Sequence, residues 1–186
     1  LACTSCSDSW LDLNPSTSVP TDQAFTTLEN AQTALNGIYR LASAHSYYGD
    51  NFFYFGDCRA ADVQARMSKG DGKRVSPYYE YNVKSTDSFN TSLPWNQVYK
   101  VIRQINNLIA AIEGGQVNTT DTQALDEIKA QALAMRGLAL YDLIRVFAMP
   151  YSYDNGQSLG VSIVTTATDQ SSKPARNTVA ECYDQI

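Results

Sequence analysis

The chain has 186 residues, of which 44% are hydrophobic and 18% charged, as in folded proteins with a core of their own. The net charge of −5 disfavours nucleic acid as a partner, because nucleic-acid binding normally needs a basic face. With His45 as the single histidine, most metal sites would lack ligands, and neither a metal nor a cofactor is expected.

Tyrosine is unusually frequent, with 12 residues against 6 phenylalanines and 2 tryptophans. A tyrosine ring stacks on apolar faces while its hydroxyl forms hydrogen bonds, which suits sugar-binding and interface surfaces. The alternative interpretation is that most of these rings are half-buried helix residues. The sequence has no run of 18 or more apolar residues, so it predicts no membrane-spanning helix.

The first residues are typical of the end of a bacterial lipoprotein signal. In such signals small residues stand immediately before a cysteine, which becomes acylated after cleavage. Thr4 and Ser5 precede Cys6, and Ala2 precedes Cys3. We predict lipidation at Cys6, with Cys3 as the alternative; a structural or redox cysteine pair and half of a zinc site also stay open. Two acyl chains would hold the protein stably at a membrane.

This interpretation divides the chain into three parts. Residues 1–6 are the expected remnant of the signal peptide with its lipidation site. Residues 7–26 are polar and contain Pro15 and Pro20, so we expect an extended tether there, because proline and the residue before it disfavour helix. Residues 27–186 are expected to form a helical domain that is incomplete at its C-terminal end.

The domain is predicted to begin with a helix at residues 27–44. Thr27 fits the N-cap position, and apolar residues recur at helical spacing. These apolar residues are Leu28, Ala31, Leu35, Ile38, Tyr39 and Ala42. Gly49 and Asp50 break the pattern. For the aromatic stretch at residues 51–63, periodicity leaves helix and strand both open.

Residues 64–92 are the least regular part of the sequence. Gly70, Gly72 and Pro77 stand there among serine, aspartate and asparagine residues, together with several tyrosines. A loop of this length inside a compact domain is often functional. The segment is therefore the first place to look for a ligand site.

A strong helix is predicted at residues 94–113. Pro94 fits its first position, and Gly114 with Gly115 ends it. Its apolar stripe consists of Trp95, Val98, Tyr99, Ile102, Ile105, Ile109 and Ile112. Because Trp95 belongs to this stripe, we expect it to pack in the core rather than to stack on a ligand.

A second long helix is predicted at residues 122–148, capped by Asp121 or Thr122 and stopped by Pro150. Its apolar face consists of Leu125, Ile128, Ala132, Met135, Ala139, Leu143 and Val146. Two arginines lie beside this face. We expect Arg136 and Arg145 to be structural and to pair with carboxylates such as Glu127 or Asp142.

The last part combines a loop at residues 151–176 with a short helix. Residues 159–164 suit a short extended piece. Thr178 and Glu181 have the spacing of a capping box, which predicts a helix start. The expected apolar side of this helix consists of Val179, Tyr183 and Ile186.

The sequence offers no catalytic signature. It contains no G-x-S-x-G, P-loop, G-x-G-x-x-G or H-E-x-x-H pattern. A glycosidase needs only two carboxylates, and 19 acidic residues leave such a pair possible by composition, but nothing in their placement indicates one. We therefore predict that the protein is not an enzyme.

Four segments together resemble the SusD/RagB family of outer-membrane nutrient-binding lipoproteins. They are CSDSWLDLNP at 6–15, WNQVYKVI with a following IN at 95–106, EIKAQALAMR and YDLIR within 127–150, and LGV, RNTV and YDQI within 159–186. Their order and spacing, rather than any one of them, carry the resemblance. The sequence departs from the family by having Gln-Ala and Arg-Gly where Glu-Ala and Arg-Ala are usual; Gly137 costs helix stability but permits close packing.

The resemblance implies a mainly α-helical fold with tetratricopeptide-like helix pairs and a ligand site on long irregular loops. It implies a lipid-anchored protein on the outer surface of the outer membrane. Such a protein captures an oligosaccharide, or occasionally a peptide, and hands it to a TonB-dependent SusC-like transporter. The alternative is a helical-repeat protein-interaction module of the outer membrane without a sugar site. Family members are much longer than this chain.

Glycan binding requires aromatic platforms for the apolar face of a sugar and planar polar groups for its hydroxyls. In the starch-binding prototype of the family, tryptophans from the segment before the Trp95 helix stack on sugar. The corresponding stretch, residues 66–81, contains no tryptophan, which argues against assuming starch. The candidate glycan-binding residues are the platforms Tyr78, Tyr79 and Tyr81 and the polar groups Arg66, Asp71, Lys73 and Arg74. The alternative is that they are solvated loop or transporter-facing residues.

Overall fold

The computed structural model describes residues 24–60, 76–82, 84, 94–167 and 172–186. Within them the chain is mainly helical and forms no strand beyond two isolated bridges, which confirms the expected fold class. The elements in chain order are α1 (Leu28–Ala42), the π-helix η2 (His45–Gly49), α2 (Asn51–Asp57), α3 (Ser76–Tyr79), α5 (Pro94–Glu113), α6 (Thr122–Phe147), the 3-10 helix η3 (Tyr151–Tyr153) and α7 (Val179–Gln185).

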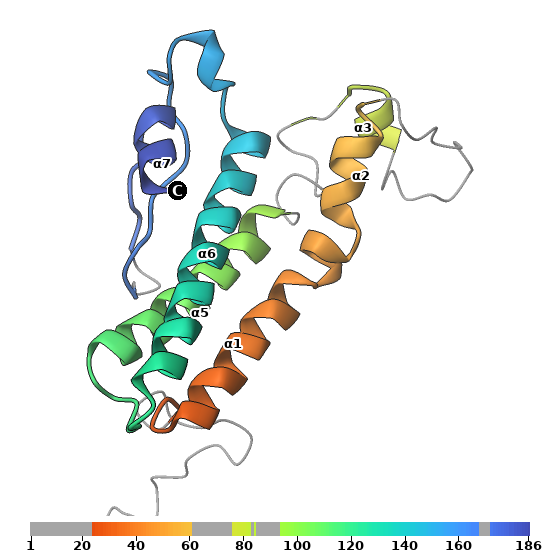
Figure 1. Cartoon of the computed structure of the whole chain (residues 1–186). Helices are drawn as coiled ribbons and strands as arrows, with labels where there is room; N and C mark the ends of the chain where they lie inside the picture. The colour runs from red at the N-terminus through yellow and green to blue at the C-terminus, as the bar shows by residue number, and fades with distance from the viewer. Residues whose placement is uncertain (1–23, 61–75, 83, 85–93, 168–171) are drawn as a thin grey trace, which may run out of the picture.

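Helices α1, α5 and α6 pack side by side and form the scaffold (Figure 1). Their predicted stripes meet in one core, in which Leu35 of α1, Ile105 of α5 and Leu143 of α6 have almost no exposed surface. Because each stripe follows the helical repeat, burying it against the other two removes most of its apolar area from water. The helix boundaries predicted for these three segments are confirmed to within two residues.

Hydrogen bonds at both ends fix α1 antiparallel to α5. At one end the Gln97 amide donates to the Leu41 carbonyl, joining the start of α5 to the end of α1 (2.8 Å). At the other end the backbone N–H of Asn118, in the connection between α5 and α6, donates to the Thr26 carbonyl (3.0 Å). Gly115 turns the chain there with a φ of 68°, a conformation that glycine adopts without a steric penalty.

The predicted extended piece runs along α5 and is held by two side chains of that helix. The Tyr99 hydroxyl donates to the Ser162 carbonyl (2.9 Å), and the Asn106 amide donates to the carbonyls of Val164 and Thr166 (2.9 and 3.1 Å). Seven helical residues rise about 10 Å, which about three extended residues also span, so the two registers match. Asn106 is buried and also accepts a hydrogen bond from Arg136.

The aromatic stretch for which helix and strand stayed open is helical from Asn51 to Asp57. It follows α1 through the π-helix η2, which ends at Gly49, and Asp50 is a non-helical residue between η2 and α2, where the sequence predicted the break. Near the other end of the chain, the capping box of Thr178 and Glu181 is present and starts α7 as predicted.

The buried side of α7 differs from the predicted stripe. Val179 is buried as expected, but the second buried residue is Cys182, whose thiol contacts the Val161 carbonyl. Tyr183 and Ile186 stay partly exposed. In so short a helix, the side that is buried depends on the neighbouring strand-like segment rather than on the helix's own periodicity.

Gly137 has the close contact that its position in the α6 sequence suggested. A Cβ atom on this glycine would lie 3.2 Å from the carbonyl oxygen of Ile186. The glycine therefore lets the end of α7 approach the backbone of α6. Among the residues that the structure describes, no helix has the length and apolar character to cross a membrane.

The buried amide of Asn106 should contribute strongly to stability. Asn106→Ala would leave two carbonyls and the Arg136 guanidinium without this partner, so we expect a loss of about 2–4 kcal/mol in the free energy of unfolding by urea denaturation. The matched control is Asn36→Ala on α1, because Asn36 is exposed and pairs only with the exposed Gln32 in the described part of the chain. The control should stay within about 0.5 kcal/mol of the unmodified protein; equal effects of the two changes would contradict the assigned role.

Candidate functional site

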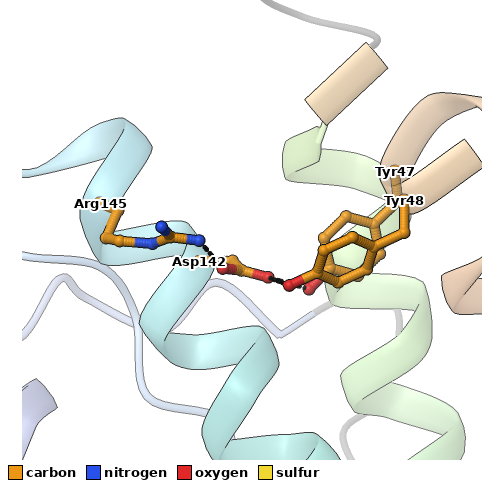
Figure 2. Close-up of polar contacts among 4 residues, drawn as sticks. All are labelled: Tyr47, Tyr48, Asp142 and Arg145. Atoms are coloured by element: carbon orange, nitrogen blue, oxygen red, sulfur yellow. Dashed lines mark hydrogen bonds and ion pairs between the residues drawn. The ribbon is translucent and has the colours of Figure 1, made fainter. Parts of the chain in front are cut away.

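A buried carboxylate joins the scaffold to the aromatic segment that follows α1. Figure 2 shows Asp142 of α6 between Arg145 on one side and Tyr47 and Tyr48 on the other. The hydroxyls of Tyr47 and Tyr48 donate to Asp142 Oδ2 at 2.6 and 2.5 Å, and Arg145 Nη2 donates to Oδ1 at 2.5 Å. We call these four residues the Asp142 network. The predicted pairing of Arg145 with Asp142 is confirmed.

The two tyrosines are bound in their neutral form. The Asp142 side chain has no exposed surface, so an unpaired charge there would be costly. Burial, followed by the hydrogen bond to Asp142, raises the pKa of Tyr48 to about 12 and raises the pKa of Tyr47 further. The rings of both tyrosines also pack on Phe52 of α2. The network therefore fixes the start of α2 on α6.

Arg136 does not have the carboxylate partner that the sequence suggested. Its guanidinium donates to Asn106 Oδ1 (3.1 Å) and to the Thr165 carbonyl (3.2 Å), not to Glu127. Trp95 packs against Tyr99 and Phe147 at ring-centroid distances of 5.0 and 4.9 Å, in keeping with a core position.

Helices α2 and α3 form a second, smaller apolar cluster beyond the network. Tyr78 of α3 meets Phe55 of α2 edge to face at 5.5 Å, and Cys58 is buried beside them. The Arg59 guanidinium lies over the outer part of this cluster, 4.7 Å from the Phe55 ring centroid. We call Phe55, Arg59, Tyr79 and Tyr81 the α2–α3 surface.

Tyr81 has an unusual backbone conformation. The backbone N–H of Tyr81 donates to the Tyr78 carbonyl and that of Asn82 to the Pro77 carbonyl, which is the Schellman pattern that ends a helix. The residue at the left-handed position of this pattern is usually glycine, but here it is tyrosine, with a φ of 54°. That conformation costs an L-residue about 1–2 kcal/mol.

The backbone strain presents an aromatic ring to solvent. Tyr81 is 68% exposed, and its hydroxyl donates to the Arg59 carbonyl, which ties α3 to the end of α2. Strained residues of this kind cluster at functional sites. Tyr81 is thus the most exposed of the three predicted tyrosine platforms.

The structure separates the three predicted tyrosine platforms. Tyr81 is open to solvent and Tyr79 is half-buried, whereas Tyr78 is only 2% exposed and its ring faces Phe55. In this arrangement the Tyr78 ring supports the surface from below. Six other predicted site residues lie outside the described residues: Cys3, Cys6, Arg66, Asp71, Lys73 and Arg74.

Sequence reasoning missed Arg59 and the role of Asp142. Arg59 is one turn beyond Phe55, a spacing that would have placed its guanidinium beside the ring once the stretch was assigned as a helix. Asp142 stands among apolar residues of α6, next to the buried Leu143, and an acidic residue in such a context calls for partners.

Comparison with known proteins identifies the family. Residues 9–186 match the SusD-like family described as starch-binding and associating with the outer membrane, and the chain belongs to that family. A SusD-like protein of Formosa agariphila is 29% identical over 151 residues, which are 78% of this chain.

Solved structures agree with this assignment. A SusD superfamily protein of Bacteroides thetaiotaomicron is 65% identical with a TM-score of 0.80 over 86% of this chain. Another of Bacteroides vulgatus is 30% identical with a TM-score of 0.78 over 87%. The chain spans only about a third of its relatives, 28% of the Formosa protein and 35% of each Bacteroides structure.

The pKa shifts in the Asp142 network predict how stability depends on alkaline pH. The Tyr48 phenol has a pKa of about 12 in the fold against an ordinary 10.0, so its contribution is full below about pH 10 and is lost as the pH rises through about 12. Burial also raises the pKa of Tyr78 to about 12. When the tyrosines are titrated spectroscopically, Tyr48→Phe and Tyr78→Phe should therefore each remove one group with a pKa of about 12.

Of the two variants, Tyr48→Phe removes a hydrogen-bond donor from Asp142 and Tyr78→Phe does not. Tyr48→Phe should lower the free energy of unfolding at neutral pH by about 1–3 kcal/mol, because a hydrogen bond to a charged group is lost. Tyr78→Phe, which has no described contact with Asp142, should leave stability nearly unchanged. Equal stability of both variants would argue against the network as the joint between α2 and α6.

Proposed function

We propose that the α2–α3 surface binds saccharide and that the protein captures glycan at the cell surface without cleaving it. The observation that carries this proposal is Tyr81: an exposed ring held in a conformation that costs free energy, with its hydroxyl bound to the backbone carbonyl of Arg59. The Arg59 guanidinium lies over the Phe55 ring of the same surface. An aromatic face and a planar hydrogen-bond donor are the two groups that a sugar requires. The family description as starch-binding supports glycan as the ligand.

Tyr79, Arg66, Asp71, Lys73 and Arg74 stay part of this proposal as further contacts of the same ligand. Because the sequence has no tryptophan in the stretch 66–81, we do not restrict the ligand to starch. The domain at residues 27–186 would act as the scaffold for the site, and the extended tether at 7–26 would connect it to the membrane.

The wider proposal concerns where the captured glycan goes. A lipoprotein acylated at Cys6, or alternatively at Cys3, would be held on the outer face of the outer membrane. From there it would pass oligosaccharide to a TonB-dependent SusC-like transporter. The family description as outer-membrane-associated supports the location.

Affinity electrophoresis tests the binding site. Neutral gels would contain amylopectin, galactomannan, xyloglucan or laminarin, and acidic gels would contain polygalacturonate, alginate or chondroitin sulfate. We expect retardation in at least one gel and an at least tenfold weaker apparent affinity for Tyr81→Ala, because a central aromatic contact is lost. Tyr81→Gly should lose binding equally but melt at a higher temperature than Tyr81→Ala, since both variants lose the hydroxyl bond to the Arg59 carbonyl and only glycine relieves the strain.

Tyr153→Ala is the matched control, because Tyr153 is equally exposed but lies in η3, outside the α2–α3 surface. It should bind as the unmodified protein does. Mobility unchanged in every gel would overturn the proposal and favour the protein-interaction module. Release of reducing sugar from the retarding polysaccharide would instead identify a surface glycosidase.

Metabolic labelling tests the anchor. We expect radiolabelled palmitate to enter the protein made with its natural signal sequence, and Cys6→Ser to abolish the label and release the protein from the outer-membrane fraction. Loss of label in Cys3→Ser instead would assign the alternative cysteine. Labelling of neither cysteine would contradict lipid anchoring.

A further inference from the structure

Part of the Arg145 guanidinium faces solvent and makes no hydrogen bond within the Asp142 network. Its Nη2 atom is bound to the buried Asp142, yet 46% of its side chain is exposed. A guanidinium carries five N–H donors, and among the described residues only Asp142 accepts from this one. Donors therefore remain on the exposed side, where Asp142 fixes their direction.

Two aromatic rings flank this guanidinium. Its Cζ atom lies 5.3 Å from the centroid of Phe52 on α2 and 4.8 Å from the centroid of Tyr141 on α6. Tyr141 is 37% exposed. The cluster thus repeats the composition of the α2–α3 surface, a planar donor group beside an aromatic ring, and adds a buried carboxylate that holds the donor in place.

Helix α2 connects the two clusters. Phe52 and Phe55 are three residues apart on this helix, so their side chains lie on the same face. The Arg59 guanidinium lies over the Phe55 ring, and the Arg145 guanidinium lies over the Phe52 ring. One face of α2 therefore has two rings in succession, each paired with a guanidinium, and the guanidinium beside Phe52 comes from α6 of the scaffold.

We propose that Arg145, with the rings of Phe52 and Tyr141, forms a second saccharide subsite that takes a neutral sugar unit of the same oligosaccharide that the α2–α3 surface binds. The inference rests on the proposed function. Neutral sugar is specified because Asp142 balances the Arg145 charge at 2.5 Å, so an anionic sugar would gain little net attraction. The hydroxyls of a neutral unit can accept from the free N–H groups while its apolar face contacts Tyr141.

Binding of short and long oligosaccharides separates this subsite from the first. The probes are oligosaccharides cut from whichever neutral polysaccharide retards the protein, measured by isothermal titration calorimetry. In the unmodified protein, affinity should rise with chain length. In Arg145→Lys and in Tyr141→Ala, long oligosaccharides should bind about three- to tenfold more weakly while short ones bind as before. The lysine keeps the charge beside Asp142 but lacks the planar fork.

The control variants match the changes in kind. Arg40→Lys alters the arginine in the last turn of α1, as Arg145 is in the last turn of α6, and Tyr153→Ala removes an exposed tyrosine outside both clusters. Both should keep the gain in affinity with chain length. Tyr141→Leu, which keeps an apolar contact with Tyr183, should lose this gain as Tyr141→Ala does.

The outcomes distinguish the two proposals. If Tyr81→Ala abolishes binding but Arg145→Lys and Tyr141→Ala retain the full gain with chain length, the second subsite is refuted and the proposed function stands. The second subsite would also be refuted if the gain in affinity with chain length weakened strongly with salt, or if only the acidic gels retarded the protein. Binding of a neutral ligand to a balanced ion pair is insensitive to screening. Absence of binding to every polysaccharide would overturn both.

Discussion

The buried charge of Asp142 constrains the rest of the molecule. A carboxylate without exposed surface is tolerated only if donors surround it, and here the donors come from two places. Arg145 belongs to the same helix, whereas Tyr47 and Tyr48 belong to the segment after α1. The charge can be satisfied only when this segment lies against α6, so the same interaction that stabilises the carboxylate also sets where α2 begins.

The position of α2 depends on the Asp142 network because, among the described residues, few other contacts hold this helix. Its own cluster with α3 is small and separate from the main core. A seven-residue helix is not stable alone, so its place depends on the contacts at its two ends. The Asp142 network and Phe52 act at the first end, and the Tyr81 hydroxyl on the Arg59 carbonyl acts just beyond the second. A rigid helical scaffold thereby carries an exposed aromatic surface.

The scaffold was predictable because its pattern is local. The stripes of α1, α5 and α6 repeat at helical spacing over 15, 20 and 26 residues, and caps such as Thr27 and Asp121 mark their starts. The same reasoning failed for α7, which is too short for its periodicity to decide which side is buried. The tyrosine partners of Asp142 were not predictable, since Tyr47 and Tyr48 are separated from it by more than 90 residues and no local pattern links them.

The candidate site shows the same division between local and distant information. The sequence selects Tyr81 because it is a tyrosine in an irregular segment, and it selects Tyr78 and Tyr79 on the same ground. What separates the three is the end of α3: the Schellman turn reverses the chain after Tyr79, so Tyr78 faces Phe55 while Tyr81 faces solvent. Glycine would form this turn at lower cost, as Gly115 does at the end of α5. A tyrosine at the position that favours glycine is therefore a stability cost in the fold, and the hydrogen bond from its hydroxyl to the Arg59 carbonyl offsets part of that cost.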